Sequence, residues 1–240
     1  NLIFSTSKRF SLFKDTVESL IHHNPDINDL IENVYILDDR SSYEDRNKME
    51  DLISQNFPHK GRLVTFNNSS YPYAYVEKLN FIQNISQGIE YTLFIEDDRK
   101  NISPLNLPSH LEYLENNHDL DQISFIENHW IQDEETKAQI SLEGEYWNAT
   151  QCPYFRYCFG QEYKPDNQIT WHWAVSTPIL SLGATLNRNT IYSRAKFKPI
   201  KYYESDFHSQ LNSKFIYTLT SKFIHTGWLS SIEQSKNFSA

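Results

Sequence analysis

The chain has 240 residues, of which 39% are hydrophobic and 15% aromatic, and a formal net charge of −9. So many large apolar side chains exclude an intrinsically disordered protein, and the length suits one large domain or two small ones. The acidic balance argues against broad binding to nucleic acid or to an anionic membrane surface, because both partners need clustered Lys and Arg.

Cysteine content and apolar runs narrow the class of protein further. Only Cys152 and Cys158 are present, too few for a disulfide framework, although a single loop-closing disulfide stays open. No run approaches about 18 consecutive apolar residues. We therefore expect a soluble chain without a membrane span and, from the sequence alone, a cytoplasmic location.

Apolar runs alternate with amphipathic stretches through the first hundred residues. The runs predict strands at Leu2–Ser5, Val34–Leu37, Leu63–Phe66 and Tyr91–Ile95. Helical spacing of apolar residues or a solvated charge pattern predicts helices at Phe10–His22, Tyr43–Ile53 and Tyr75–Ile89. Strands separated by helices of this length indicate right-handed crossover units and a parallel sheet covered on both faces.

The second half of the chain is less regular. Periodicity predicts helices at Ser109–Asn116, Pro178–Leu186 and Glu204–Ser213, and strands at Gln122–Ile126 and Phe215–Ile224. No internal repeat or Gly/Ser linker divides the chain, so we expect one domain over 1–240, with a regular half at 1–100 and a variable half at 101–240.

Acidic side chains follow two of the predicted strands directly. Asp38 and Asp39 come after VYIL, and Glu96, Asp97 and Asp98 come after YTLFI. Ligands of open parallel sheets bind at the carboxyl ends of the strands. Carboxylates gathered there repel one another unless they are compensated, which predicts a divalent metal or hydrogen bonds to sugar hydroxyls. Helix capping is the alternative for any single Asp.

The order of these segments resembles a known enzyme family. FSTSKRFSLFKDTVESLI, then VYILDDRSS, then a helix and EYTLFIEDD are similar to the nucleotide-sugar-dependent glycosyltransferases of the GT-A fold, especially the family-2-like group, over roughly residues 2–98. The resemblance implies an α/β, Rossmann-like, mostly parallel central sheet flanked by helices. It also implies a nucleotide-sugar-binding half at 1–100 and a less regular acceptor-binding half at 101–240.

Carried over residue by residue, the resemblance implies a donor site at the strand ends. Ser5 and Thr6 would border the nucleotide, and Asp39 would contact the base or ribose. Lys78, followed by Asn80 in YVEKLN, resembles a basic residue that precedes an Asn in the family. A solvated lysine on its helix is the alternative interpretation of Lys78.

The acidic run after the fourth strand resembles the metal-binding DxD motif of the family. Asp98 would ligate Mn²⁺ or Mg²⁺, whose preferred ligands are carboxylate oxygens. Glu96 would face the ribose or a metal-bound water, and Asp97 is counted with the donor site. His225, in KFIHTGW, resembles a late histidine that joins the metal, although the default for a lone His is a structural role.

Residues further along resemble the acceptor side of the family. KYYESDFHSQL places Asp206 as general base, but Ser205 stands where family members often have Glu, which leaves Glu204 as a rival base. Both acids could instead only complement a helix N-terminus. Trp171 and Trp173 belong to an aromatic run that could form an acceptor wall or simply fill a core.

These observations predict a metal-dependent glycosyltransferase. It would move a sugar from a nucleoside diphosphate donor, with UDP favoured, to a hydroxyl of a glycan, lipid-linked or protein acceptor, with inversion if Asp206 is the base. Two alternatives stay open. A nucleotidyltransferase also uses paired carboxylates on a metal, although FSTSKRFS lacks the glycines of a triphosphate loop. A non-catalytic carbohydrate-binding domain would keep the aromatic wall without turnover.

Overall fold

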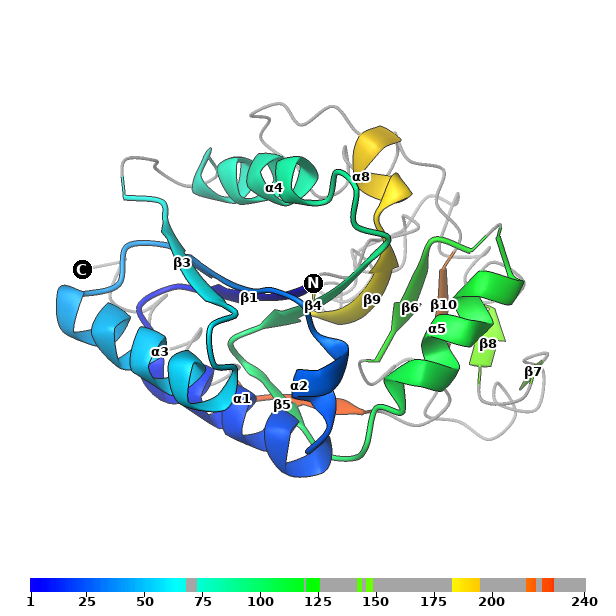
Figure 1. The fold of residues 1–240 in the computed structure, drawn as a ribbon, viewed down its shortest axis with the longest axis horizontal. Helices are drawn as coiled ribbons and strands as arrows, with labels where there is room; N and C mark the ends of the chain where they lie inside the picture. The colour runs from blue at the N-terminus through cyan, green and yellow to red at the C-terminus, as the bar shows by residue number, and fades with distance from the viewer. Residues whose placement is uncertain are drawn as a thin grey trace, which may run out of the picture.

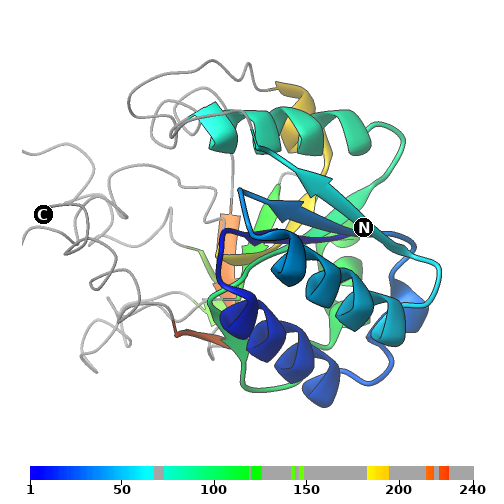
Figure 2. The same cartoon turned by 90° about the vertical axis from the view of Figure 1, so that its left-hand side faces the viewer.

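The computed structural model describes residues 1–67, 73–118, 120–125, 142–143, 146–148, 183–194, 215–218 and 222–226. The described strands form one nine-stranded sheet, in the order β3-β2-β1-β4-β9-β6-β10-β8-β7, and one two-stranded sheet, β11-β5. Helices cover both faces of the large sheet, with α4 and α8 on one side and α1 and α3 on the other (Figures 1 and 2).

The first half of the chain supplies four parallel strands and the helices between them. Its elements are β1 (Leu2–Thr6), α1 (Phe10–His23), α2 (Ile27–Leu30), β2 (Val34–Asp38), α3 (Tyr43–Asn56), β3 (Gly61–Thr65), α4 (Tyr73–Ile85) and β4 (Tyr91–Glu96). Strand β1 pairs in parallel with β2 on one side and with β4 on the other. The predicted strands and long helices of this half are confirmed, with boundaries shifted by a few residues, whereas the short α2 has no counterpart among the predicted elements.

Strand β1 is buried on both faces because a helix layer covers each side of the sheet. Leu2 and Phe4 belong to the apolar core beneath α1 and α3, where the rings of Phe4 and Phe13 meet edge to face at 5.5 Å. Ile3 belongs to the smaller core beneath α4 and α8, together with Leu37. This alternation follows from the period of two along a strand, and it explains the unbroken apolar runs of the sequence.

The second half adds β5 (Arg99–Asn101), α5 (Leu107–Asn116), β6 (Gln122–Ser124), β7 (Leu142–Glu143), β8 (Tyr146–Asn148), β9 (Ala184–Arg188), α8 (Thr190–Arg194), β10 (Phe215–Thr218) and β11 (Phe223–His225). Strand β9 runs antiparallel between β4 and β6. In this part of the sheet β4, β6 and β10 keep the common direction, so the sheet is mostly parallel.

Two predictions for the second half are wrong. Residues 184–186 were expected to continue a helix from Pro178, but they open β9, where Thr185 and Asn187 are buried and Asn187 binds Gln122 of β6. These polar side chains hydrogen-bond inside the sheet, although in the sequence they resemble those of surface residues. The single strand expected over Phe215–Ile224 is two strands in different sheets. The helix predicted at Glu204–Ser213 lies outside the described residues.

Open α/β sheets form a ligand crevice at the carboxyl ends of the strands where the strand order reverses, and here that point lies between β1 and β4. After β1 the chain builds β2 and β3 on one side, and it then returns to add β4 on the other side of β1. The loops that follow β1 and β4 therefore diverge, which is the switch point where open α/β sheets bind ligands. In the part of the chain that the structure describes, no helix is long and apolar enough to cross a membrane.

Candidate functional site

The ends of β1 and β4 are joined side chain to side chain at the switch point. Ser5 pairs with Glu96 in the parallel register, so the residues that follow each of them are neighbours. The Thr6 hydroxyl donates to Asp97 Oδ2 at 2.8 Å, and the Ser7 backbone N–H donates to the same oxygen at 3.2 Å. The predicted convergence of the first and fourth strand ends is therefore present in the structure.

Arg9, which the sequence interpretation missed, is the main partner of the acidic run. Its guanidinium binds both oxygens of Asp97, and Nη1 also donates to Asp98 Oδ2 at 3.1 Å. Burial disfavours the charge on Arg9, but the two carboxylates outweigh that effect and raise its pKa. The sequence does show a cation three residues after the end of β1 and two adjacent acids directly after β4. It does not show that this cation binds these acids, because that contact depends on the pairing of the two strands.

Asp97 is a buried carboxylate that holds the loop after β1. Its side chain is 0% exposed. Burial raises its pKa, while Arg9 and the Thr6 hydroxyl act in the opposite direction. The side chain faces into the protein, so a bound donor would meet Asp97 only through the residues that it positions, Thr6, Ser7 and Arg9.

The two acids on either side of Asp97 share a second arginine. Arg99 donates to Glu96 Oε2 at 3.3 and 3.1 Å, and its Nε lies 3.6 Å from Asp98 Oδ1. Burial raises the pKa of Glu96, and Arg99 lowers it in part. Gly183 leaves room for this arrangement, because a Cβ at that position would lie 3.0 Å from Arg99 Nε.

Strand β11 brings the C-terminal segment to the acidic run. In its antiparallel register with β5, His225 stands opposite Arg99. The Thr226 backbone N–H then donates to the Asp98 carbonyl at 2.8 Å. The backbone of His225 is therefore beside the acidic run, as the sequence interpretation required; the side chain of His225 lies outside the described residues.

The end of β2 contributes one inward and one outward acid. Asp38 is 0% exposed and accepts from the Ser41 backbone N–H at 3.2 Å and from Arg46 Nε at 2.8 Å, so it builds the loop before α3. Asp39 is partly exposed; Arg40 Nε donates to it at 2.8 Å, and its own N–H donates to the Thr6 carbonyl at 3.0 Å. Asp39 is thus beside Thr6 at the crevice.

Lys78 reaches the same strand end from α4. It is 7% exposed, and its Nζ donates to Ser5 Oγ at 3.2 Å and to the Thr6 carbonyl at 3.1 Å. Burial lowers its pKa, and the nearest acids, led by Asp39, oppose that shift. Lys78 is therefore not the solvated helix lysine that was the alternative interpretation.

All five carboxylates at these strand ends have an arginine partner, and the chemistry of the group can be compared with that of a metal site. Among the side chains that the structure describes, no three His, Cys, Asp or Glu residues cluster closely enough to hold an ion. Asp98 nevertheless offers the hard oxygen that Mn²⁺ and Mg²⁺ prefer, and the backbone of His225 is near it. Asp98 is therefore the described ligand candidate for a divalent ion, and Arg9 and Arg99 flank its carboxylate.

Four predicted site residues cannot be compared with this arrangement. Asp206, Glu204, Trp171 and Trp173 all lie outside the described residues. Their roles stay predictions.

Comparison with known proteins supports the fold. Neither models of protein families nor curated proteins match the sequence. S. aureus TarS matches with a TM-score of 0.56 and 12% identity over 94% of this chain. Glucosyl-3-phosphoglycerate synthase from Mycobacterium tuberculosis, solved with Mn²⁺, UDP and glucosyl-3-phosphoglycerate, matches with a TM-score of 0.54 and 13% identity over 97% of this chain. The chain has the GT-A fold.

This finding confirms the fold that the segment order predicted. The chain spans 36% of TarS, 74% of the synthase, and 66% of a mycobacterial protein that it matches with a TM-score of 0.51 and 11% identity over 93% of this chain. At these identities the likeness concerns the GT-A fold alone.

Proposed function

We propose that this chain is a metal-dependent glycosyltransferase that moves a sugar from a nucleoside diphosphate sugar to an acceptor hydroxyl. The observation that carries the proposal is the junction of strand ends at the switch point of a GT-A sheet. There Thr6 binds Asp97 and the Asp39 backbone, and Arg9 links Asp97 to Asp98. The synthase from Mycobacterium tuberculosis was solved with UDP and Mn²⁺, which supports UDP as the nucleotide and a divalent cofactor here. A cytoplasmic location stays a prediction.

The donor would lie across the ends of β1, β2 and β4. Asp39 has the exposure needed to bind the base or ribose, and Ser5 and Thr6 border the nucleotide. Lys78, on α4, is bound to both of these β1 residues, so its contribution is to hold the strand end in place. Glu96 and Asp98 stand at the diphosphate side, where Mn²⁺ or Mg²⁺, when bound, would neutralise charge on the departing nucleoside diphosphate.

The acceptor half completes the chemistry. Asp206, with Glu204 as the rival, takes the proton from an acceptor hydroxyl. The hydroxyl oxygen then forms the new glycosidic bond as the bond from the anomeric carbon to the diphosphate oxygen breaks, with inversion at that carbon. Trp171 and Trp173 pack on the C–H faces of a glycan, lipid-linked or protein acceptor.

The direct test is a thermal-shift panel of UDP, GDP, TDP and CMP sugars with and without Mn²⁺. We expect one nucleotide to raise the melting temperature, and excess chelator to remove the rise. Asp98→Asn should abolish the Mn²⁺-dependent part of the shift, whereas Asp51→Asn, at an exposed position of α3, should leave it unchanged.

Transfer is tested separately with radiolabelled donor. Asp206→Asn should retain the nucleotide-induced shift and lose sugar release from the donor. A chain that shows no nucleotide response with any divalent ion would exclude the glycosyltransferase proposal and leave a carbohydrate-binding domain. Loss of the nucleotide response in Asp206→Asn would instead move Asp206 into the nucleotide site.

A further inference from the structure

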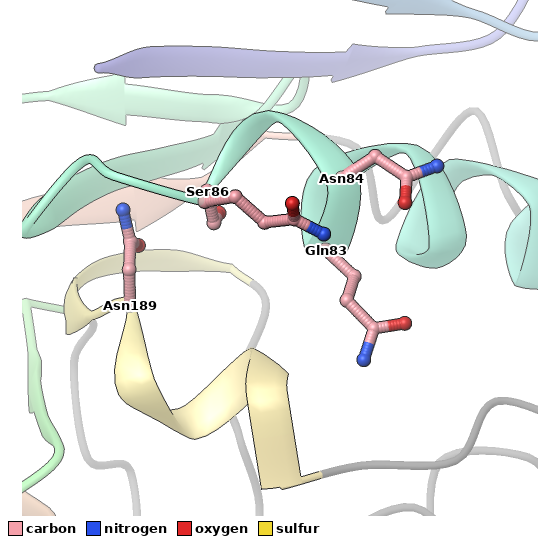
Figure 3. A pocket seen from close by; sticks show the side chains of 5 residues that line it. Gln83, Asn84, Ser86 and Asn189 are labelled. Atoms are coloured by element: carbon pink, nitrogen blue, oxygen red, sulfur yellow. The ribbon is translucent and has the colours of Figure 1, made fainter.

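A second recess lies away from the crevice, at the other end of α4. It has a volume of about 380 Å³, within the range of small-molecule sites, and is lined by Gln83, Asn84, Ser86, Gln87 and Asn189. The first four come from the last turn of α4 and the turn after it, and Asn189 comes from the turn between β9 and α8 (Figure 3).

The described side chains that line this recess are uncharged, and each of them carries a polar group. Four carboxamides and one hydroxyl belong to these side chains. Among the described residues the recess therefore offers several hydrogen-bond donors and acceptors and no charged group, beside the apolar parts of the same side chains. A charged ligand would find no counter-charge among these side chains, and an apolar ligand would leave buried amides without partners. The chemistry that matches is a small neutral molecule bearing several hydroxyl groups.

The floor of the recess carries two buried polar atoms without a hydrogen-bond partner, Ser86 Oγ and Asn189 Oδ1. Ser86 is 7% exposed and Asn189 is 5% exposed. The orientation of the Asn189 amide is set by the fold, because its Nδ2 donates to the Ile89 carbonyl at 2.9 Å, and this leaves Oδ1 as an acceptor. Buried acceptors without partners cost free energy, which a hydroxyl donor from a ligand would recover.

Two hydrogen bonds join the elements around the recess. The Asn189 N–H donates to the Glu90 carbonyl at 2.8 Å, which ties the β9–α8 turn to the start of β4. Gln83 Nε2 donates to the Tyr192 carbonyl at 2.7 Å, which ties α4 to α8. A ligand would therefore meet amides that are already oriented.

We propose that this recess binds a neutral saccharide, independently of the nucleotide crevice. Ser86 lies eight positions beyond Lys78, so roughly 12 Å of helix separates the recess from the crevice. The two sites also lie at opposite ends of β4. The preference for a saccharide over a peptide rests on the proposed function, because a glycan-modifying enzyme gains from holding a second part of its acceptor.

The test is an NMR titration of the full ¹⁵N-labelled chain with UDP and Mn²⁺ present throughout. Glucose, galactose and N-acetylglucosamine are the neutral probes, and glucuronate and triglycine are the charged and peptide comparators. We expect at least one neutral sugar to shift the amide resonances of Ser86, Gln87 and Asn189 in a saturable way, and the comparators to leave them in place.

Two variants separate binding from folding. Ser86→Ala removes a hydroxyl that has no partner in the fold, so the melting temperature should stay equal or rise while the sugar binds roughly fivefold more weakly, as expected for one lost hydrogen bond. Gln87→Ala should weaken binding similarly. Gln55→Ala, at an exposed position of α3, is the matched control and should bind as the wild type does.

The proposal is overturned if no neutral sugar shifts these resonances, or if triglycine shifts them equally. It is also overturned if the Ser86→Ala variant binds the sugar with unchanged affinity. Failure of the proposed function is distinguishable from these outcomes. Asp98→Asn, which should remove the Mn²⁺-dependent part of the nucleotide response, should leave sugar binding at the recess intact. A wild type that binds sugar at the recess without any nucleotide response would exclude the glycosyltransferase alone.

Discussion

Asp97 is a carboxyl side chain with no access to water, and Arg9 is its principal cationic partner. The carboxylate is 0% exposed, whereas the Arg9 side chain is 22% exposed. Removing one partner of such a pair strands the other charge in the interior, which costs more than the pair itself contributes. The ion pair is therefore expected to decide whether the loop after β1 holds its conformation.

We predict that Arg9→Gln lowers the free energy of unfolding by roughly 3 kcal/mol at pH 7. Without Arg9 the pKa of Asp97, already raised by burial, should rise further. When the pKa of a carboxyl is higher in the folded chain than in the unfolded chain, the folded chain is favoured at a pH below the unfolded-state pKa. This contribution to stability is lost as the pH rises through the folded-state pKa. The deficit of Arg9→Gln should therefore be smaller at pH 4 than at pH 7.

Urea unfolding at both pH values measures this effect. Arg40→Gln is the matched control, because the Arg40–Asp39 pair is more exposed and should contribute less than about 1 kcal/mol. The double variant Arg9→Gln with Asp97→Asn should regain part of the lost stability. Equal deficits for Arg9→Gln and Arg40→Gln would show that the Arg9 pair has no special weight.

Arg99 affects the proposed metal site through charge. Its Nε lies 3.6 Å from Asp98 Oδ1, so a cation bound at Asp98 would be repelled by the guanidinium. We predict that Arg99→Gln strengthens Mn²⁺ binding by roughly fivefold to tenfold at low salt, and that the gain shrinks as salt is added. Titration of free Mn²⁺ by electron paramagnetic resonance measures the affinity directly.

The matched control is Arg62→Gln, which changes the same net charge at an exposed position of β3. It should alter Mn²⁺ affinity much less. Weaker binding in Arg99→Gln would instead mean that Arg99 orients the carboxylates for the ion, and the repulsion argument would fail.

At the scale of elements, Asn101 joins β5 to β11. Its Nδ2 donates to the Lys222 carbonyl at 2.8 Å, and its Oδ1 accepts from Asn24 Nδ2 at 3.0 Å. Strand β11 in turn leads to Thr226, which binds the Asp98 carbonyl. The short β11 is therefore attached to the acidic run through backbone pairing and one buried amide.

We predict that Asn101→Ala costs roughly 2 to 3 kcal/mol, because several buried polar groups lose their partner. Hydrogen exchange at the Thr226 amide should also accelerate, since β11 loses one of its attachments. Asn117→Ala serves as the control, because it removes one hydrogen bond from a side-chain amide to the Tyr113 carbonyl near the end of α5. It should leave the exchange rate of Thr226 unchanged, and an unchanged rate in both variants would contradict the prediction.

Lys78 links α4 to the end of β1 and introduces a pH dependence. Because burial lowers its folded-state pKa below 10.5, the unfolded chain binds more protons between these two values. Stability therefore rises with pH in that window. We predict that the wild type gains stability relative to Lys78→Met as pH rises from 7 toward 10, as measured by chemical denaturation.

Comparison with Lys48→Met, an exposed lysine of α3, removes the contributions of other titrating groups. If the stability difference between wild type and Lys78→Met stays constant over this pH range, Lys78 does not titrate in the folded state there, and the burial argument fails.

At the scale of the whole molecule, the sheet lies between two apolar cores, and the crevice lies at the carboxyl ends of its strands. Phe13 is 0% exposed in the larger core, where its ring packs against Phe4 of β1. We predict that Phe13→Ala lowers the free energy of unfolding by about 3 to 5 kcal/mol. Where the variant is still folded, at low temperature, its UDP affinity should equal that of the wild type. A large loss of affinity would show that the core and the site are coupled.

Most of the first half of the fold could be predicted because its signals are local. Strands buried on both faces appear as unbroken apolar runs, and the helices between them show apolar spacing or solvated charge. The prediction failed at β9, where Asn187 and Thr185 form internal hydrogen bonds and so resemble surface residues in the sequence. Binding between distant polar residues has no local signal.

The sequence by itself determined the order of strands and helices and the presence of acids at the ends of β2 and β4, because both depend on neighbouring residues. Only the tertiary structure decided which acids turn inward. Asp97 and Asp98 are adjacent and identical in type, yet Asp97 is held by Thr6 and Arg9 while Asp98 lies between two arginines. The physical reason is the parallel pairing of β1 with β4 across some 90 residues of chain, which sets the neighbours of each carboxylate.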